Sequence, residues 1–482
     1  MVHDRLPGRT TLESEGHAAI TVTDRPNAYH TWGTKAEELR RTSTAWPLLH
    51  EGQHTPPLRD APLSPLPPQS RQRTVRPLVH LRRRRDVRFC PLGEGVEHAH
   101  TEGVTRMSRI PYLTAEELSD EQRCLAEQLA ASRGGRLVGP GAFWLRNPAL
   151  AAQADAWRLL MERRTSLPRR LSELAILVAN RHFTASYAWC RHTAAASRAG
   201  LDRAVIEALA DRQQPTCSDP LEAMVYGVSR EFLETTGLSE ATYARVLAAL
   251  GPARLVELVA LVGYGCMLSL AVNTFEPDPF PDDRALVSAG PPPTTYARAP
   301  GGARLAPQQD AAWSDAQRRL ATPLEVGSPG SVKGAYAIWL RTPEIAERAL
   351  QYEQVLYSNF AVPLPFRELV VLVAARFWTA DALWTEHRDW ALDAGLRADV
   401  IAAIAEHRTP RGASADEALA HAFASALLTQ GRVDDDTFAL AVARFGYQAV
   451  VELVGVAGFY SLVALTCNAL AAPPARGAFT TR

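Results

Sequence analysis

The feature that most constrains the fold of this chain is an internal repeat. His192 and His387 lie 195 residues apart (387 − 192), and many other identical residues are related by the same offset. Ten of the twenty positions that end at His192 are identical to those that end at His387, and the register holds without a gap. The matched pairs include Arg109/Arg304, Glu173/Glu368, Arg181/Arg376, Trp189/Trp384 and Asn273/Asn468. Tandem copies of one unit are therefore predicted.

Composition separates these copies from the remaining segments. The N-terminal segment is rich in Pro and Arg without a sustained apolar period, which predicts disorder, and its run Arg82–Arg85 is interpreted as a solvated basic tail. Met107 is a candidate for the true start. The predicted organisation is a tail at 1–106, a first copy at 107–275, a Pro/Gly-rich linker at 276–302, a second copy at 303–475 and a short tail at 476–482.

Within each copy the apolar spacing is helical, and no alternating segment suggests a strand. Thr114 with Glu117 predicts a capped helix start, and Asp202 predicts another. Gly200 predicts a helix end, while Gly251-Pro252 predicts a break before a long apolar helix. The expected fold class is all-α.

Bulk properties exclude several classes of function. Lys plus Arg and Asp plus Glu both total 52, so charge gives no reason to expect nucleic-acid or membrane-surface binding. The six cysteines contain no Cys-x-x-Cys, which indicates free thiols and a reducing cytoplasm, and no signal peptide is evident. The apolar runs at 255–272 and 450–467 carry Glu257 and Glu452, which favours buried helices with interhelical hydrogen bonds over membrane spans.

The stretches "ELAILVANRHFTASYAWCRHTAAASRAGL" and "ELVVLVAARFWTADALWTEHRDWALDAGL" carry a family resemblance. Both resemble the carboxymuconolactone decarboxylase family of the alkylhydroperoxidase D-like superfamily, over nearly all of 107–475. The resemblance implies two helical domains that form an internal pseudo-dimer, with further homo-oligomers as an option.

The redox branch of that superfamily has a Cys pair between its Glu and its His. The matching positions here are Ala185 and Ala188 in the first copy, and Ala380 and Leu383 in the second. Cys190 stands two residues beyond the second position. A dithiol peroxidase needs an attacking and a resolving thiol, so peroxidase activity is disfavoured.

The decarboxylase branch implies cofactor-free loss of CO₂ from a small carboxylated lactone or a cyclic keto acid. His would transfer the proton, a carboxylate would orient it, Arg would anchor the substrate carboxylate and Trp would exclude water. The candidates are His192, Glu173, Arg181 and Trp189 in the first copy, and His387, Glu368, Arg376 and Trp384 in the second. No metal-ligand spacing is evident, so neither metal nor cofactor is expected.

Two alternatives stay open on the sequence. Many relatives have Glu four residues before the His, where this chain has Ala188 and Leu383. That difference is compatible with a binding or assembly module that has lost its chemistry. The Glu, Arg, His and Trp residues also fit structural roles in a packed core.

Overall fold

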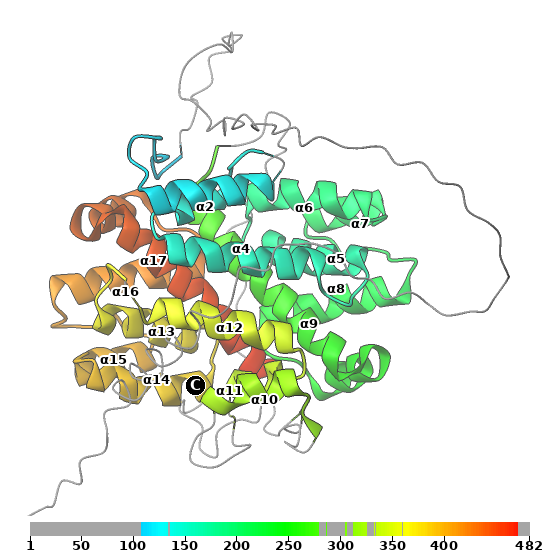
Figure 1. Cartoon of the computed structure of the whole chain (residues 1–482). Coiled ribbons are helices and arrows are strands. Elements are labelled where there is room, and N and C mark those ends of the chain that lie inside the picture. The colour runs from blue at the N-terminus through cyan, green and yellow to red at the C-terminus, as the bar shows by residue number, and fades with distance from the viewer. Residues whose placement is uncertain are drawn as a thin grey trace, which may run out of the picture. The chain divides into compact units, whose positions relative to one another are not determined.

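The computed structural model describes residues 108–133, 135–278, 286, 304–305, 312–324, 332, 334–358 and 360–470, all within one compact unit at 51–482. All the secondary-structure elements in these ranges are α-helices or 3-10 helices and none is a strand, which confirms the all-α prediction (Figure 1). The predicted tails at 1–106 and 476–482, Met107 and most of the linker lie outside the described residues.

The described part of the first copy contains eight helices: α2 (Asp120–Ala131), α3 (Pro140–Trp144), α4 (Pro148–Arg163), α5 (Arg169–His182), α6 (Ser186–Arg198), α7 (Arg203–Ala210), α8 (Pro220–Thr235) and α9 (Glu240–Phe275). The second copy contains α10 (Asp315–Ala321), the 3-10 turn η2 (Thr322–Leu324), α11 (Gly334–Trp339), α12 (Pro343–Leu356), α13 (Leu364–Phe377), α14 (Asp381–Asp393), α15 (Ala398–Ala405), α16 (Ala415–Gln430) and α17 (Asp435–Leu470). From α5/α13 to α9/α17, each pair of helices begins and ends at positions 195 residues apart.

Local signals explain most helix boundaries. Gly200 follows α6 with φ +87°, and Asp202 caps α7 by accepting a hydrogen bond from Ala204 N. Gly251 has φ +74° and kinks α9 before Pro252. The predicted helix start at Thr114 is wrong, because residues 115–117 form a turn and the first helix begins at Asp120. Ser119 and Gln122 form the capping box there, since each satisfies the backbone N–H of the other.

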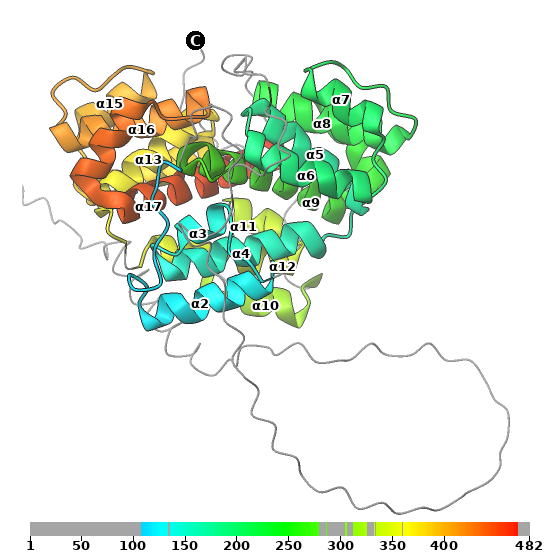
Figure 2. The ribbon, with the colours of Figure 1, turned by 90° about the horizontal axis from the view of Figure 1, so that it is seen from above.

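The two copies contact each other through reciprocal pairs of residues. α9 packs against α17 and α4 packs against α12, which lie side by side in Figures 1 and 2. A Cβ added at Gly263 would lie 3.1 Å from Leu462 Cα, and one at Gly458 would lie 3.3 Å from Met267 Cα. These two contacts exchange under the offset of 195, as expected for surfaces related by a two-fold axis.

An arginine near the beginning of each copy also makes a reciprocal contact with the other copy. Arg109 lies over the ring of Phe438, with 4.0 Å from its Cζ to the ring centroid. Arg304 lies over Tyr243 at 5.2 Å. Each arginine thus binds the long apolar helix of the other copy, α17 or α9.

The two long helices α9 and α17 are apolar and long enough to cross a membrane by length and composition, which is weak evidence because 94% of each apolar window is buried. The acid in each helix binds protein groups. Glu257 accepts hydrogen bonds from the backbone and hydroxyl of Ser166. Glu452 accepts from Val362 N and from the side chain of Asn147 in the first copy. Both acids bind connections between helices, in agreement with the hydrogen-bonding role predicted for them.

Candidate functional site

Each copy holds a buried glutamate–histidine pair formed by two consecutive helices. In the first copy, Nδ1 of His192 on α6 lies 2.7 Å from Oε2 of Glu173 on α5. In the second, Nδ1 of His387 on α14 lies 2.8 Å from Oε2 of Glu368 on α13. Both carboxylates are fully buried, and the histidines are 5% and 2% exposed. A carboxylate at Nδ1 orients the ring and leaves Nε2 as the nitrogen that can serve a ligand.

The turn before the histidine helix brings the pair together in the same way in both copies. Thr184 and Thr379 both have φ +52°, a left-handed conformation that residues other than glycine rarely adopt. The turn is held by a side-chain amide from the long apolar helix: Asn273 donates to Phe183 O and Asn468 donates to Trp378 O. The matched asparagines therefore fix the angle at which one helix meets the next.

The copies differ at the second oxygen of the glutamate. Oε1 of Glu173 forms an ion pair with Arg169, one turn earlier on α5. Leu364 occupies the position of Arg169 in the second copy. There the hydroxyl of Tyr357 donates to Oε1 of Glu368 over 2.8 Å. The first carboxylate is thus held by a cation and the second by a neutral phenol.

A cavity of about 80 Å³ lies against His192 in the first copy. Its polar lining consists of Arg133, Arg158, Glu162, Tyr187, Arg191, His192 and Tyr264. Val138, Pro140 and Leu268 supply apolar surface. Such a mixture of apolar walls and a few converging polar groups is typical of sites for small molecules, although this cavity is small for one.

Two arginines in the cavity wall are bound by two acids of α4. Asp155 accepts from Arg133 Nη2 at 2.6 Å and from Arg158 Nε at 2.7 Å. Arg158 Nη1 also lies 3.2 Å from Oε2 of Glu162. Burial acts to lower the pKa of Arg158, but the hydrogen bond to Asp155 and the charges of Asp155 and Glu162 together outweigh burial and raise that pKa. Burial raises the pKa of Tyr264 well above its ordinary value, so this phenol stays a hydrogen-bond donor beside Glu162.

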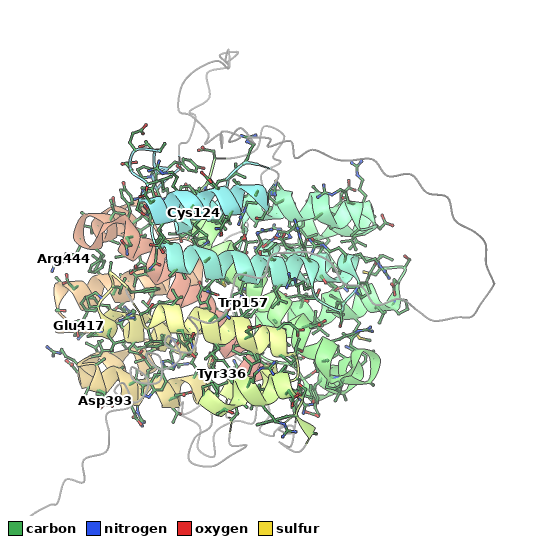
Figure 3. All side chains as sticks on the ribbon, in the orientation of Figure 1. Cys124, Trp157, Tyr336, Asp393, Glu417 and Arg444 are labelled. Atoms are coloured by element: carbon green, nitrogen blue, oxygen red, sulfur yellow. The ribbon has the colours of Figure 1, made fainter. Side chains whose placement is uncertain are left out.

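The corresponding region of the second copy contains a different network. Tyr336 of α11, labelled in Figure 3, donates to Glu353 at 2.5 Å. Tyr460 donates to the other oxygen of Glu353 at 3.1 Å, and it lies 3.0 Å from the hydroxyl of Tyr357. Together with Tyr357 and Glu368, these residues form a continuous series of polar contacts that reaches His387. Each phenol has one proton, so Tyr357 and Tyr460 cannot donate to the two glutamates and also to each other at the same time.

Aromatic rings flank the second histidine. The ring centroids of Trp390 and Tyr460 lie 4.8 and 4.9 Å from that of His387. Ala195 and Gly265 occupy the matching positions of the first copy, and Gly141 matches Tyr336. Burial acts to lower the pKa of His387, but the charge of Glu368 and the hydrogen bond to it outweigh burial and raise the pKa. The described surroundings of the two histidines are therefore chemically unlike.

Of the residues predicted for the site, the structure brings the glutamates and histidines together and places the arginines elsewhere. Arg181 Nε donates to Ala210 O at 2.8 Å, and Arg376 Nε donates to Ala405 O at 2.7 Å. Both thereby bind the end of the short helix α7 or α15. Arg181 does not line the cavity beside His192. Burial, assisted by the nearby Arg212, lowers the pKa of Arg181 to about 10.

The positions of the two predicted tryptophans agree with a role in packing. Trp189 and Trp384 are 5% and 3% exposed, and Trp189 does not line the cavity. Ala188, at the position where many relatives have Glu, does line it. Cys190 is a partly buried thiol outside the lining.

Sequence reasoning missed Arg133, Arg158 and Glu162. These residues do not repeat: Glu353 and Tyr357 stand at the positions that match Arg158 and Glu162. Matching the two copies selects what they share, so it could not find residues that one copy alone carries. The spacing Asp155, Arg158, Glu162 on one helix face was the available signal, because i,i+3 and i,i+4 pairs meet on a helix.

Among the described residues, no group of three or more His, Cys, Asp or Glu side chains is arranged to hold a metal ion. Comparison of the chain with protein-family models, with curated proteins and with solved structures found no significant match.

Proposed function

We propose that the first copy is a cofactor-independent lyase that acts on a small carboxylated lactone or cyclic keto acid. The observation that carries the proposal is the His192–Glu173 pair, 2.7 Å apart and buried, on the wall of a cavity lined by guanidinium groups. The family resemblance of both copies, and their reciprocal packing as an internal pseudo-dimer, support the same assignment.

The chemistry needs a cation near the substrate carboxylate and a proton donor near the adjacent carbon. When the bond to CO₂ breaks, its electron pair stays on the substrate and is delocalised into the lactone or keto carbonyl. That carbon then takes one proton, and we assign its delivery to Nε2 of His192, with Glu173 holding the ring in place. Arg158 and Arg133 replace Arg181 as the proposed partners of the carboxylate, because they line the cavity.

The experiment is a CO₂-release assay on carboxymuconolactone and a panel of lactone acids. His192→Ala should abolish turnover while the circular dichroism spectrum stays that of the parent. The matched variant His387→Ala should keep turnover, because the proposal confines the reaction to the first copy. Full activity in His192→Ala with every acid that is turned over would refute the assignment.

A second candidate is a binding or assembly module without chemistry. It is favoured by the second copy, where Tyr336, Tyr357 and Tyr460 surround the retained His387–Glu368 pair. Binding of small acids to the first copy with no product formed from any of them would support this candidate.

A peroxidase based on Cys190 is the weakest candidate, because this thiol does not line the cavity and its counterpart in the second copy is Thr385. Cys190→Ser should therefore leave any reduction of organic peroxides unchanged. A loss of peroxide reduction in that variant would support a peroxidase function.

A further inference from the structure

The acid Glu162 stands where a substrate carboxylate would have to bind. Three guanidinium groups line the cavity, and two of them, those of Arg133 and Arg158, already have carboxylate partners. Asp155 binds Arg133 and Arg158 at 2.6 and 2.7 Å, and Glu162 binds Arg158 at the longer distance of 3.2 Å. Asp155 is 8% exposed and binds both arginines, whereas Glu162 binds only Arg158 of the two and lines the cavity. Glu162 is therefore the more easily displaced of the two acids.

The other hydrogen bonds of Arg158 leave few donors for a ligand. Its Nε is used by Asp155, and its Nη2 donates to Ser132 Oγ at 3.0 Å. A substrate carboxylate can therefore obtain a fork of two N–H groups from Arg158 only where Glu162 now sits. Two carboxylates cannot share that position while both are charged, because like charges at this range repel strongly where water is scarce.

We infer that a small carboxylate enters this cavity by displacing Glu162 from Arg158, and that the chain takes up one proton on Glu162 as it does so. The inference rests on the proposed function and specifies how that site recognises its substrate. Glu162 then acts as a neutral hydrogen-bond donor beside the bound carboxylate. The net charge of the cavity is the same before and after binding, because the charge of the ligand replaces that of Glu162.

The proton balance of the proposed reaction agrees with this step. Loss of CO₂ from a carboxylate anion leaves a carbanion that consumes one proton. The one proton that Glu162 takes up when the substrate binds supplies the one proton that the carbanion needs. Glu162 then returns to its charged form on Arg158. His192 passes this proton to the carbon, since it lines the same cavity.

Charged and titratable groups face Glu162 from each neighbouring segment, and they are the alternatives to it as the proton acceptor. They are Arg133 after α2, Asp155 and Arg158 on α4, Arg169 and Glu173 on α5, Arg191 and His192 on α6, and Tyr264 on α9. Arginines and a buried phenol are already protonated at pH 7. His192, Glu173 and Asp155 thus remain as the competitors that the experiment must separate from Glu162.

The test uses 2-furoate, a flat five-membered-ring carboxylate that cannot undergo the proposed reaction readily, and isothermal titration calorimetry with the full chain. Titrations at pH 7 in two buffers with different ionisation enthalpies give the number of protons taken up. We expect about one proton per bound furoate, and an affinity that falls about tenfold per unit of rising pH. Furan-2-carboxamide, which has the same shape without the charge, should bind with no proton uptake.

Three variants assign the proton. Glu162→Gln should bind furoate without proton uptake and with little dependence on pH, whereas Arg158→Gln should lose at least tenfold in affinity. His192→Asn should keep the uptake. The exposed Glu207, paired with Arg203 on α7, provides the matched control, because Glu207→Gln should change neither quantity.

Furoate binding without proton uptake, or uptake that persists in Glu162→Gln, would overturn the inference, as would no binding of furoate at all. These outcomes are independent of the CO₂ assay. Proton-coupled binding without turnover of any acid would leave the inference standing and remove the proposed reaction. Turnover of an acid, together with furoate binding that takes up no proton, would remove the inference and leave the proposed reaction standing.

Discussion

Arg158 and Glu353 stand at matching positions of the two copies and carry opposite charges. Arg158 binds Asp155 and Glu162 in the wall of a cavity, while Glu353 accepts hydrogen bonds from Tyr336 and Tyr460. Burial raises the pKa of Glu353 above its ordinary value of 4.5. The reversal of charge at this one position makes it unfavourable for the two copies to bind the same ligand, even though their glutamate–histidine pairs are alike.

The contact between α9 and α17 should depend on the absence of a side chain at Gly263. A Cβ there would lie 2.5 Å from Leu462 Cδ1 and 3.1 Å from its Cα. Gly263→Ala should therefore lower the free energy of unfolding by about 1–3 kcal/mol, because a packed core resists added volume. Gly227→Ala on α8 is the control: a Cβ there meets nothing within 4 Å, and it should stabilise the helix by about 0.5–1 kcal/mol. Urea denaturation measures both, and equal effects would contradict the close packing of the copies.

Two tyrosines of the second copy, the half-buried Tyr357 and the buried Tyr352, should respond oppositely to loss of their hydroxyl. Tyr357 OH donates to Glu368 and lies 3.0 Å from Tyr460 OH, so Tyr357→Phe leaves a buried carboxylate with one partner fewer and should cost about 1–3 kcal/mol. The hydroxyl of Tyr352 is buried and has no hydrogen-bond partner among the described residues. Tyr352→Phe should thus be neutral or stabilise by about 1 kcal/mol. Thermal unfolding of both variants tests this, and destabilisation by Tyr352→Phe would show that its hydroxyl is satisfied.

The network of the second copy should make stability depend on pH. The pKa of His387 is raised above 6.5 and that of Glu353 above 4.5. A group with a raised folded-state pKa binds its proton more tightly in the folded protein. Its contribution is complete below the unfolded pKa and is lost as the pH rises through the folded pKa. The contribution of Glu353 should therefore decline as the pH rises above 4.5, and that of His387 as it rises above 6.5.

Urea unfolding at a series of pH values from 5 to 9 measures this decline. His387→Asn keeps an N–H donor at the place of Nδ1 but cannot titrate, so it should remove the part of the decline above pH 6.5. A decline of unchanged slope in this variant would show that other groups cause it.

The matched arginines should act on stability and not on ligand binding. Arg181→Gln and Arg376→Gln remove the hydrogen bonds to Ala210 O and Ala405 O, which close the ends of α7 and α15. Each should cost about 1–3 kcal/mol, because a partly buried carbonyl loses a charged donor. The affinity of the first copy for furoate should stay within about twofold of the parent in both variants. A tenfold loss of furoate affinity in Arg181→Gln alone would show that Arg181 takes part in ligand binding.

Much of the secondary structure was predictable because its signals are local. The cap at Asp202 and the glycine at 200 act within a few residues of where they stand. The start of the first helix was misplaced because two capping-box patterns follow each other, at Thr114–Glu117 and Ser119–Gln122, and only the second leads into helix.

The glutamate–histidine pairs were predictable for a related reason. Helix lengths and the intervening turn are identical in α5–α6 and α13–α14, so the spacing of nineteen residues places the acid against the imidazole in both copies. The arginines were misjudged because a residue kept in both copies can be kept for helix ends as well as for a ligand. Arg181 and Arg376 bind carbonyl groups that lie 29 residues further along the chain.

The amino-acid sequence by itself determined the repeat, its register, the all-helical class and the residues that pair as acid and imidazole, since periodicity and spacing act along the chain. Only the tertiary structure decided which cations and acids surround each pair. Arg133, Glu162, His192 and Tyr264 come from four separate segments, and their electrostatic environment exists only once those segments pack together.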